Sequence, residues 1–213
     1  ATGSGKTTLA GLIPRFYDAT QGTVLVDGVD VRDYTFDALY DRLGYVTQKA
    51  VLFSGTVQDN IFFGQSEAAD TDETLQQAQA AEFVDRYPEK AAHPIAQLGR
   101  NVSGGQKQRL SIARALARRP EILIFDDSFS ALDYKTDATL REGLAKQLPG
   151  TTKIIVAQRI STIRHADQIL VLDRGEIAGL GTHDALMASC PVYREIAMSQ
   201  LSEEELKKGG ASK

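Results

Sequence analysis

Short apolar runs, separated by longer polar and mixed stretches, dominate the hydrophobic pattern of this chain. Runs of four to six apolar residues rich in valine and isoleucine are typical of strands buried on both faces of a sheet. We expect strands at residues 23–26, 44–48, 122–126, 153–157 and 168–173. We expect helices after Lys6, over about 72–81, from Ser103 to about Arg119, and over roughly 136–147. This alternation predicts an α/β fold with a mostly parallel sheet and helices on both faces.

The pattern between residues 49 and 118 is different, because almost no strand signal occurs there. We therefore expect a helical lobe over 49–118, inserted into a core that is formed by 1–48 and 119–185 and followed by a helical tail over 186–213. Within that tail, residues 202–210 predict a short, solvated helix. The simplest division of residues 1–213 is thus a single domain with lobes.

The helix expected after residue 102 begins with Ser103, Gly104, Gly105 and Gln106. A serine at the N-cap with a glutamine three residues later is a capping box. The two glycines leave the backbone N–H groups of the first turn accessible, and such a helix end attracts anionic phosphate. An ordinary helix start that carries two glycines is the alternative interpretation.

Residues 3–8 match the end of the phosphate-binding pattern G-x-x-x-x-G-K-[ST]. The opening glycine of that pattern would lie just before Ala1, so we expect the chain to start inside its own motif. Glycines let backbone N–H groups turn inward around an anion, Lys6 supplies a positive charge to the β- and γ-phosphates, and the Thr7 hydroxyl can ligate Mg²⁺. A turn rich in glycine and serine is the alternative.

The apolar run at 122–125 ends in Asp126. Ligands of open α/β sheets sit at the carboxyl ends of the strands. Taken alone, an aspartate at the end of a strand is more often a turn residue. Together with a Lys-Thr phosphate loop, it predicts that Asp126 holds Mg²⁺ opposite Thr7.

These motifs, in this order, make the chain resemble the nucleotide-binding domain of an ATP-binding cassette (ABC) transporter from Ala1 to about Gln200. The set is far more specific than any one of its members. The matching motifs are Walker A (Lys6, Thr7), the Q-loop (Gln48), the signature (residues 103–106), Walker B (Asp126) and the D-loop (residues 130–133).

The resemblance implies a P-loop NTPase (RecA-like) fold that binds ATP and Mg²⁺. It places metal contacts at Thr7, Gln48 and Asp126. It places nucleotide contacts at Thr2, Gly3, Ser4, Gly5, Lys6, Thr7, Thr8, Gln48, Ser103, Gly104, Gly105, Gln106 and Asp133.

Residues 52–56 and 59–61 are similar to the segment that follows the Q-loop in exporters with fused membrane helices. The resemblance therefore implies a transmembrane domain upstream on the same polypeptide, a second nucleotide-binding domain as partner, and a location at the cytoplasmic face of the cell membrane. The strand before the phosphate loop and the aromatic residue that stacks on adenine would also lie upstream. We expect apolar surface to be uncovered where that strand is missing.

Two residues that this chain would place around the γ-phosphate depart from the family pattern. Asp127 follows the Walker B aspartate, where active members carry a glutamate that orients or deprotonates the attacking water. Gln158 stands in place of the switch histidine and cannot become cationic near neutral pH. We interpret Asp127 and Gln158 as the catalytic positions of a degenerate ATP site, although an aspartate that works through an extra water would leave the enzyme active.

The two domains of this family meet head to tail, so each signature serves the ATP held by the other domain. A chain that combines an intact signature with Asp127 and Gln158 at its own catalytic positions resembles one half of a heterodimeric exporter, with a different chain as partner. An active homodimeric exporter domain and a non-transport ABC ATPase that acts on DNA or ribosomes are the alternatives. The net charge of −4 and the exporter-like segment oppose the last class and predict no nucleic-acid partner.

Composition adds only compatible limits. With 213 residues, 42% hydrophobic and 24% charged, the chain is long enough to bury a sizeable core. Cys190 is the single cysteine, which excludes an internal disulfide and suits a reducing compartment. No apolar run reaches the ~20 residues that span a bilayer.

Overall fold

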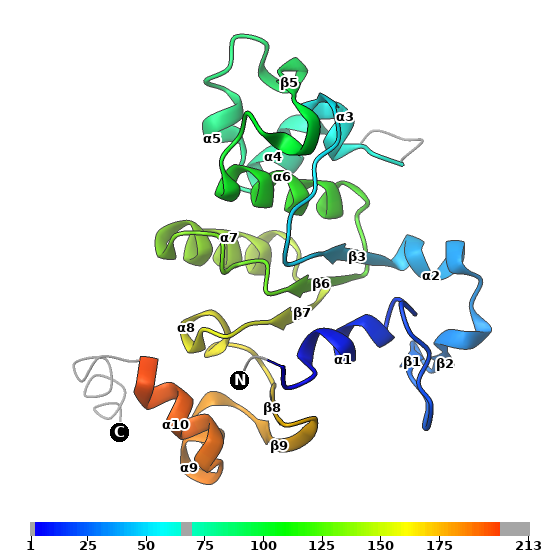
Figure 1. Ribbon diagram of the computed structural model, residues 1–213, viewed down its shortest axis with the longest axis vertical. Helices are drawn as coiled ribbons and strands as arrows, with labels where there is room; N and C mark the ends of the chain where they lie inside the picture. The colour runs from blue at the N-terminus through cyan, green and yellow to red at the C-terminus, as the bar shows by residue number, and fades with distance from the viewer. Residues whose placement is uncertain (1–2, 65–69, 201–213) are drawn as a thin grey trace. The chain divides into compact units, whose positions relative to one another are not determined.

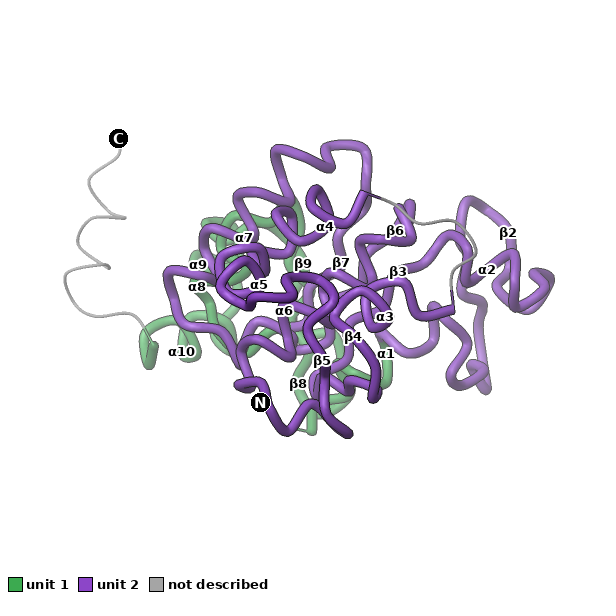
Figure 2. Tube along the Cα trace, turned by 90° about the horizontal axis from the view of Figure 1, so that it is seen from above, with its two compact units in different colours: residues 1–9, 157–213 green, residues 10–156 purple. Residues whose placement is uncertain are grey.

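The structure is a computed structural model in which residues 3–64 and 70–200 are described. The expected nucleotide contact of Thr2 and the helix expected at 202–210 lie outside these residues. The chain divides into two compact units, which are residues 10–156 and residues 1–9 together with 157–213 (Figure 2). Each unit has its own hydrophobic core. The domain boundaries expected from the sequence stay a prediction.

A three-stranded parallel sheet lies at the centre of the 10–156 unit. Its strands are β3 (Leu43–Val46), β6 (Ile122–Asp126) and β7 (Thr152–Val156), in the order β3-β6-β7 (Figure 1). The side chains of Leu123, Ile124 and Phe125 are fully buried. The expected strand at 122–126, buried on both faces, is confirmed.

A small hairpin precedes this sheet. β1 (Leu25–Val26) pairs antiparallel with β2 (Val29–Asp30), and the two residues between them, Asp27 and Gly28, have φ values of 50° and 79°. Two consecutive left-handed residues form the type I′ turn that an Asp-Gly pair favours. That pair was the sequence signal for β2, which we did not predict. η1 (Val31–Asp33) and α2 (Phe36–Arg42) lead from this hairpin into β3.

Residues 55–117 of the same unit are mostly helical, as expected for the lobe. The elements are β4 (Gly55–Thr56), α3 (Val57–Ile61), α4 (Thr71–Gln77), α5 (Ala81–Val84), η2 (Lys90–Ala92), β5 (Pro94–Ile95), η3 (Gln97–Gly99) and α6 (Gly104–Ala117). α6 packs against α3, α4 and strand β3. α7 (Tyr134–Gln147) follows β6 and packs against α4.

The lobe differs from the expectation in two ways. The helix expected over 72–81 is divided into α4 and α5, because Gln79 has a left-handed φ of 55° between them. The small β4–β5 pair joins residues 55–56 to residues 94–95, within a lobe in which we expected almost no strand.

Gly44 marks a close approach between strand β3 and the C-terminal part of α6. A Cβ atom at this position would lie 2.8 Å from Cδ2 of Leu123, 2.9 Å from Cγ of Pro120 and 3.2 Å from the carbonyl oxygen of Ala115. Contacts below 3.0 Å are too short for carbon atoms, so a side chain here would force Leu123 and Pro120 to shift, and the helix carbonyl at 3.2 Å leaves little room beside them. α6 can therefore lie directly on β3.

The other unit contains the start of α1 (Lys6–Leu12), then α8 (Ile160–Ile163), β8 (Ile169–Asp173), β9 (Glu176–Gly181), α9 (His183–Ser189) and α10 (Pro191–Gln200). β8 and β9 form an antiparallel pair around Arg174 and Gly175, whose φ values are 48° and 84°. The expected strand at 168–173 therefore belongs to a hairpin instead of the parallel sheet, and β9 was not predicted. Ile160, Tyr193 and Ala197 contribute to the buried core of this unit.

Candidate functional site

The phosphate-loop residues of the 1–9 segment have the backbone that their glycines predict. Gly3 and Gly5 have φ values of 83° and 92°, a left-handed conformation that favours glycine. The Lys6 ammonium donates a hydrogen bond to Oγ of buried Ser4 at 3.0 Å. Thr7 and Thr8 are exposed in the first turn of α1. These features agree with a loop that turns N–H groups toward an anion.

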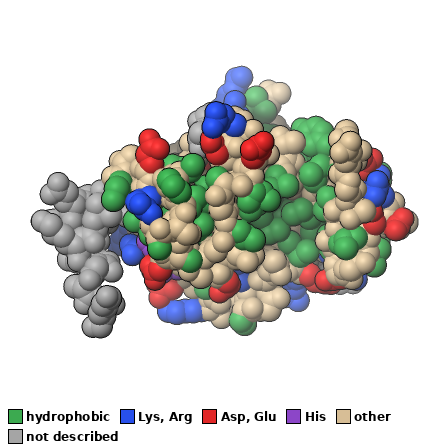
Figure 3. Space-filling view, turned by 90° about the horizontal axis from the view of Figure 1, so that it is seen from below, with side chains coloured by type: hydrophobic (Ala, Val, Ile, Leu, Met, Phe, Trp, Pro, Cys, Tyr) green, Lys and Arg blue, Asp and Glu red, His purple; other side chains and the backbone are tan. Residues whose placement is uncertain are grey.

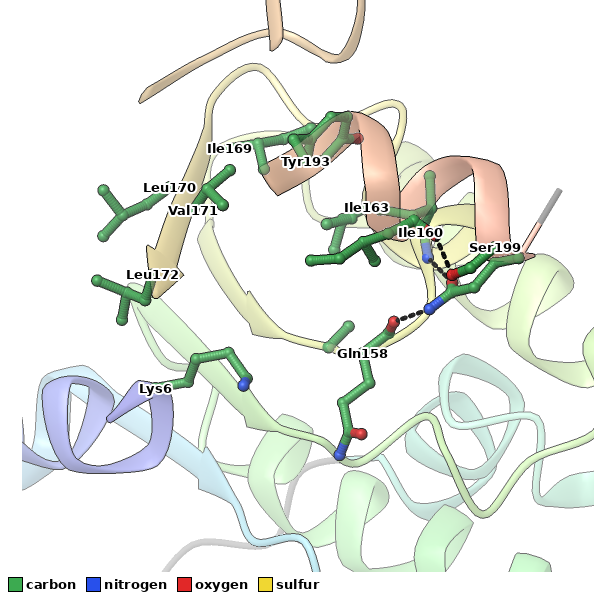
Figure 4. A pocket seen from close by; sticks show the side chains of 13 residues that line it. Lys6, Gln158, Ile160, Ile163, Ile169, Leu170, Val171, Leu172, Tyr193 and Ser199 are labelled. Atoms are coloured by element: carbon green, nitrogen blue, oxygen red, sulfur yellow. Dashed lines mark hydrogen bonds between the residues drawn. The ribbon is translucent and has the colours of Figure 1, made fainter. Parts of the chain in front are cut away.

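Lys6 and Gln158 line the same groove, which has a volume of about 280 Å³ (Figure 4). Both side chains extend from the same side of this groove, whereas aliphatic side chains such as Ile163, Val171 and Leu172 line much of the remainder. The structure thus places the Walker A lysine and the switch-position glutamine beside one space. Whether a strand that precedes Ala1 covers the apolar part stays a prediction.

Asp126 lies at the C-terminal end of β6 and is only 4% exposed. Its carboxylate accepts a hydrogen bond from the hydroxyl of Tyr45 on the neighbouring strand β3, at 3.1 Å. Burial, and then the negative charge of Asp126, raise the pKa of the Tyr45 hydroxyl above its ordinary value. Tyr45 therefore remains a neutral donor to this carboxylate. We did not predict this contact, which joins residues far apart in the sequence.

Asp127 is 8% exposed and follows β6 directly. Gln48 donates from Nε2 to Oδ2 of Asp127 at 3.0 Å, so the structure brings the Q-loop residue to the position that follows Asp126. Asp127 has a left-handed φ of 49°. Aspartate adopts this conformation more readily than most residues that carry a Cβ atom. Its carbonyl oxygen also accepts the Ser130 hydroxyl at 2.7 Å, which fixes the backbone of this turn.

A buried glutamine in the signature helix supports the Q-loop. Gln108 is 1% exposed, and its Nε2 donates to the carbonyl oxygen of Thr47 at 3.2 Å. Thr47 immediately precedes Gln48, so the position of the Q-loop depends on α6. The sequence predicted this helix from its capping box and did not name Gln108 or its acceptor.

The capping box at the start of α6 is confirmed. Ser103 Oγ accepts the backbone N–H of Gln106 at 3.2 Å, and Gln106 Oε1 accepts the backbone N–H of Ser103 at 2.8 Å. A Cβ atom at Gly104 would meet nothing within 4 Å, and at Gly105 only the carbonyl oxygen of Ala131 at 3.6 Å. The described residues of this chain therefore leave open space in front of Gly104.

The D-loop aspartate caps the next helix. Asp133 accepts the backbone N–H of Thr136 at 2.9 Å and its hydroxyl at 2.7 Å. These two bonds, the backbone bond first, lower the pKa of the Asp133 carboxyl below its ordinary value. Asp133 thus has a structural role in α7, and its expected contact with nucleotide stays a prediction.

Comparison with known proteins identifies the family. The family model described as ABC transporter matches residues 1–130. The chain belongs to the ABC transporter family. It is the nucleotide-binding domain, with the P-loop NTPase fold and its parallel sheet, and ATP binding follows from this membership.

Three similar proteins illustrate the range of this ABC family. The chain is 48% identical over 203 residues to an uncharacterized ABC transporter ATP-binding protein of Mycobacterium tuberculosis, covering 94% of this chain and 35% of the relative. It is 41% identical over 207 residues to an ATP-dependent lipid A-core flippase of Syntrophus aciditrophicus, covering 96% and 34%. A solved bacterial Atm1-family ABC exporter with ATP bound superposes with a TM-score of 0.90 at 38% identity, covering 95% and 36%. The chain thus spans about a third of the length of these relatives.

The residue types that the family resemblance assigns to Mg²⁺ are ones that this ion accepts. Thr7, Gln48 and Asp126 offer hydroxyl, amide and carboxylate oxygens, which are ligands that Mg²⁺ accepts. Over residues 3–64 and 70–200, no cluster of three His, Cys, Asp or Glu side chains could hold a metal ion alone. One carboxylate suits a metal that takes its remaining ligands from phosphate and water. In that same part of the chain, no helix is long and apolar enough to cross a membrane.

Proposed function

We propose that this chain is the ATP-binding domain of a heterodimeric exporter, in which its own ATP site hydrolyses slowly and its signature completes a competent site on a different partner chain. The contrast between two described regions carries this proposal. The short carboxylate of Asp127 is buried and engaged by Gln48, whereas the signature residue Gly104 faces open space.

The groups expected to bind nucleotide are all present. Residues 3–8 supply the phosphate loop, with Lys6 as its cation, and Asp126, Thr7 and Gln48 supply oxygen ligands. Bound Mg²⁺ would neutralise charge on the β- and γ-phosphates. The chain's own contribution is to hold ATP in position, which needs no general base.

The groups expected to promote hydrolysis are weak. A general base must lie about 2.6–3.2 Å from its proton, and aspartate is one methylene shorter than glutamate. The carboxylate of Asp127 is further held at 3.0 Å by the amide of Gln48. Gln158 can donate and accept hydrogen bonds but cannot carry a positive charge to the phosphate. Loss of a general base lowers the rate by about 10²–10⁴-fold.

The transport function is proposed from the longer relatives. Their names include a flippase and an exporter, and this chain spans about a third of their length. We propose that a transmembrane domain precedes this domain on the same polypeptide and that the domain works at the cytoplasmic face of the cell membrane, where it couples ATP to substrate export. Acidic and basic side chains are interspersed on the face shown in Figure 3, unlike the basic surface that nucleic-acid binding uses.

The test compares Gly104→Glu with Asp127→Ala in one membrane preparation of the assembled transporter with its partner. Gly104→Glu places a negative charge where phosphate should approach the first turn of α6. It should lower total ATPase activity by about 10²-fold, as the loss of a phosphate-facing donor does elsewhere. Asp127→Ala should change it less than about twofold, because the competent site uses another chain's catalytic groups.

Asp72→Ala, an exposed position in α4, serves as the control for a lost carboxylate. Equal losses of ATPase activity from Gly104→Glu and Asp127→Ala would show that both ATP sites hydrolyse ATP at similar rates. That result would replace the heterodimer proposal with an active homodimeric exporter.

A further inference from the structure

The last residue of helix α10 holds the loop that carries the switch-position glutamine. Gln200 donates from Nε2 to the carbonyl oxygen of Gln158 at 2.7 Å, and its Oε1 accepts the backbone N–H of Ile160 at 2.9 Å. Figure 4 shows these contacts as dashed lines beside the groove. One side-chain amide therefore binds two backbone groups on either side of Arg159.

This pair of bonds replaces an ordinary helix cap. Ile160 is the first residue of α8, and the N-cap residue Arg159 makes no side-chain cap hydrogen bond. The first N–H groups of a helix need partners from outside the helix. Gln200 supplies the partner for Ile160 from forty residues further along the chain. The start of α8 is thus set by α10.

Both ends of the contact are anchored by packing. Ile160 on α8 and Tyr193 and Ala197 on α10 are buried in the same hydrophobic core. Gln200 itself is exposed, so its truncation leaves no internal cavity. The function of its amide can therefore be separated from the stability of the fold.

The two bonds restrict the peptide groups on either side of Arg159, the first of which contains the carbonyl of Gln158. They therefore restrict the backbone that carries the Gln158 side chain. Gln158 and Lys6 line the same groove, and in Figure 4 the Gln158 side chain extends away from Ile160 and Ile163 toward the lower part of the view, where Lys6 also lies. We propose that Gln200 is a positioning residue that holds Gln158 toward the γ-phosphate of ATP bound in this chain's own site. The inference rests on the proposed role of Gln158 in that site.

Three substitutions test the inference in the assembled transporter, with the partner's own Walker site inactivated. Gln200→Ala removes both bonds, and Gln200→Glu keeps the acceptor for Ile160 but replaces the donor to Gln158 with a repelling oxygen. Gln147→Ala is the matched control, because Gln147 is also an exposed glutamine at the last position of a helix.

The first readout is hydrogen exchange of the Ile160 amide. Gln200→Ala should speed it about two- to tenfold, the effect of losing a hydrogen bond of typical net strength. Gln200→Glu and Gln147→Ala should leave it near the parent value. Unchanged exchange in Gln200→Ala would overturn the contact, whatever the outcome for the ATP site.

The second readout is single-turnover phosphate release, followed to completion at this site. Gln200→Ala and Gln200→Glu should both lower the rate about two- to tenfold with little change in the affinity for ATP, because they affect orientation and not binding. In a Gln158→Ala background, Gln200→Ala should have no additional effect, since it acts through Gln158.

An equal effect of Gln200→Ala with and without Gln158 would overturn the positioning role. Failure of the heterodimer test is a separate result, because it concerns total activity and the two signatures. The coupling between Gln200 and Gln158 is measured within one site and would remain even if both sites were active.

Discussion

The N-terminal end of α6 and the C-terminal end of β6 lie in the same compact unit but face different environments. At the start of α6, Ser103 and Gly104 are exposed, and the bonds of the capping box use only residues of the same turn. At the end of β6, Asp126 and Asp127 are buried and bonded to Tyr45 and Gln48. The first end is available to an outside molecule, and the second is held by its own chain.

A sequence motif does not tell which of its residues the fold itself needs and which contact another molecule. The difference between these two ends does. Glycine in a helix costs about 1 kcal/mol relative to alanine, and nothing in this chain would collide with a side chain at Gly104. The fold therefore does not require Gly104, which favours a role in contact with something else. Asp127, in contrast, has a left-handed backbone and several internal bonds, so the fold itself constrains that position.

The largest expected effect comes from introducing the glutamate and the histidine that the family pattern carries at positions 127 and 158. Asp127→Glu combined with Gln158→His should raise turnover at this chain's own site by about 10²-fold, and the two changes should combine non-additively because they act on one phosphate. The measurement is phosphate release with the partner's Walker site blocked. The strained φ of 49° should make Asp127→Glu less stable by about 1 kcal/mol.

Asp72→Glu on the exposed face of α4 is the control for an added methylene. If the parent site already hydrolyses ATP as fast as the double variant, the start of α6 and the end of β6 would both belong to active sites. The active homodimer would then be the better description.

A smaller effect is expected on the affinity for MgATP, which should depend on the phosphate loop and not on the signature. Lys6→Ala should weaken MgATP binding by about 10- to 100-fold, because it removes the charged donor of the phosphate loop. Gly104→Glu should leave binding to this chain unchanged, since its signature serves a partner. Calorimetry on full-length protein measures both, with Cys190→Ser as a control distant in sequence from the phosphate loop. Unchanged affinity in Lys6→Ala would contradict the assignment of the ATP site.

The smallest effect is on stability. Gly104→Ala should leave the free energy of unfolding unchanged or raise it by up to about 1 kcal/mol, because alanine is the better helix former and meets no atom. The same substitution should lower ATPase activity of the assembled transporter. Urea unfolding and ATPase assays on one preparation compare the two. A clear loss of stability would show that Gly104 is needed by the fold itself.

Local sequence patterns predicted the parts of the site that depend on local chemistry. Two such features are confirmed, the capping box of Ser103 and Gln106 and the buried strand that ends at Asp126. Both could be predicted because each shows in a pattern of a few neighbouring residues. The left-handed glycines of the phosphate loop agree with their motif.

The remaining contacts join residues that the sequence separates widely. Nothing near Tyr45 indicates that its hydroxyl meets Asp126, and a glutamine at the end of a helix, such as Gln200, is usually only solvated. The buried amide of Gln108 is similar, because its acceptor, the carbonyl oxygen of Thr47, lies sixty-one residues away in the sequence. These contacts follow from the packing of strands and helices, which a single sequence does not specify.

Gly44 has a consequence for how this domain can change during evolution. A side chain at that position would force Leu123 and Pro120 to shift and would crowd the Ala115 carbonyl of α6, and α6 carries both the signature at its first turn and the amide that supports the Q-loop. A substitution far from nucleotide would thus shift two distant parts of the ATPase together. We expect a library of variants at position 44 to return glycine alone when selected for transport.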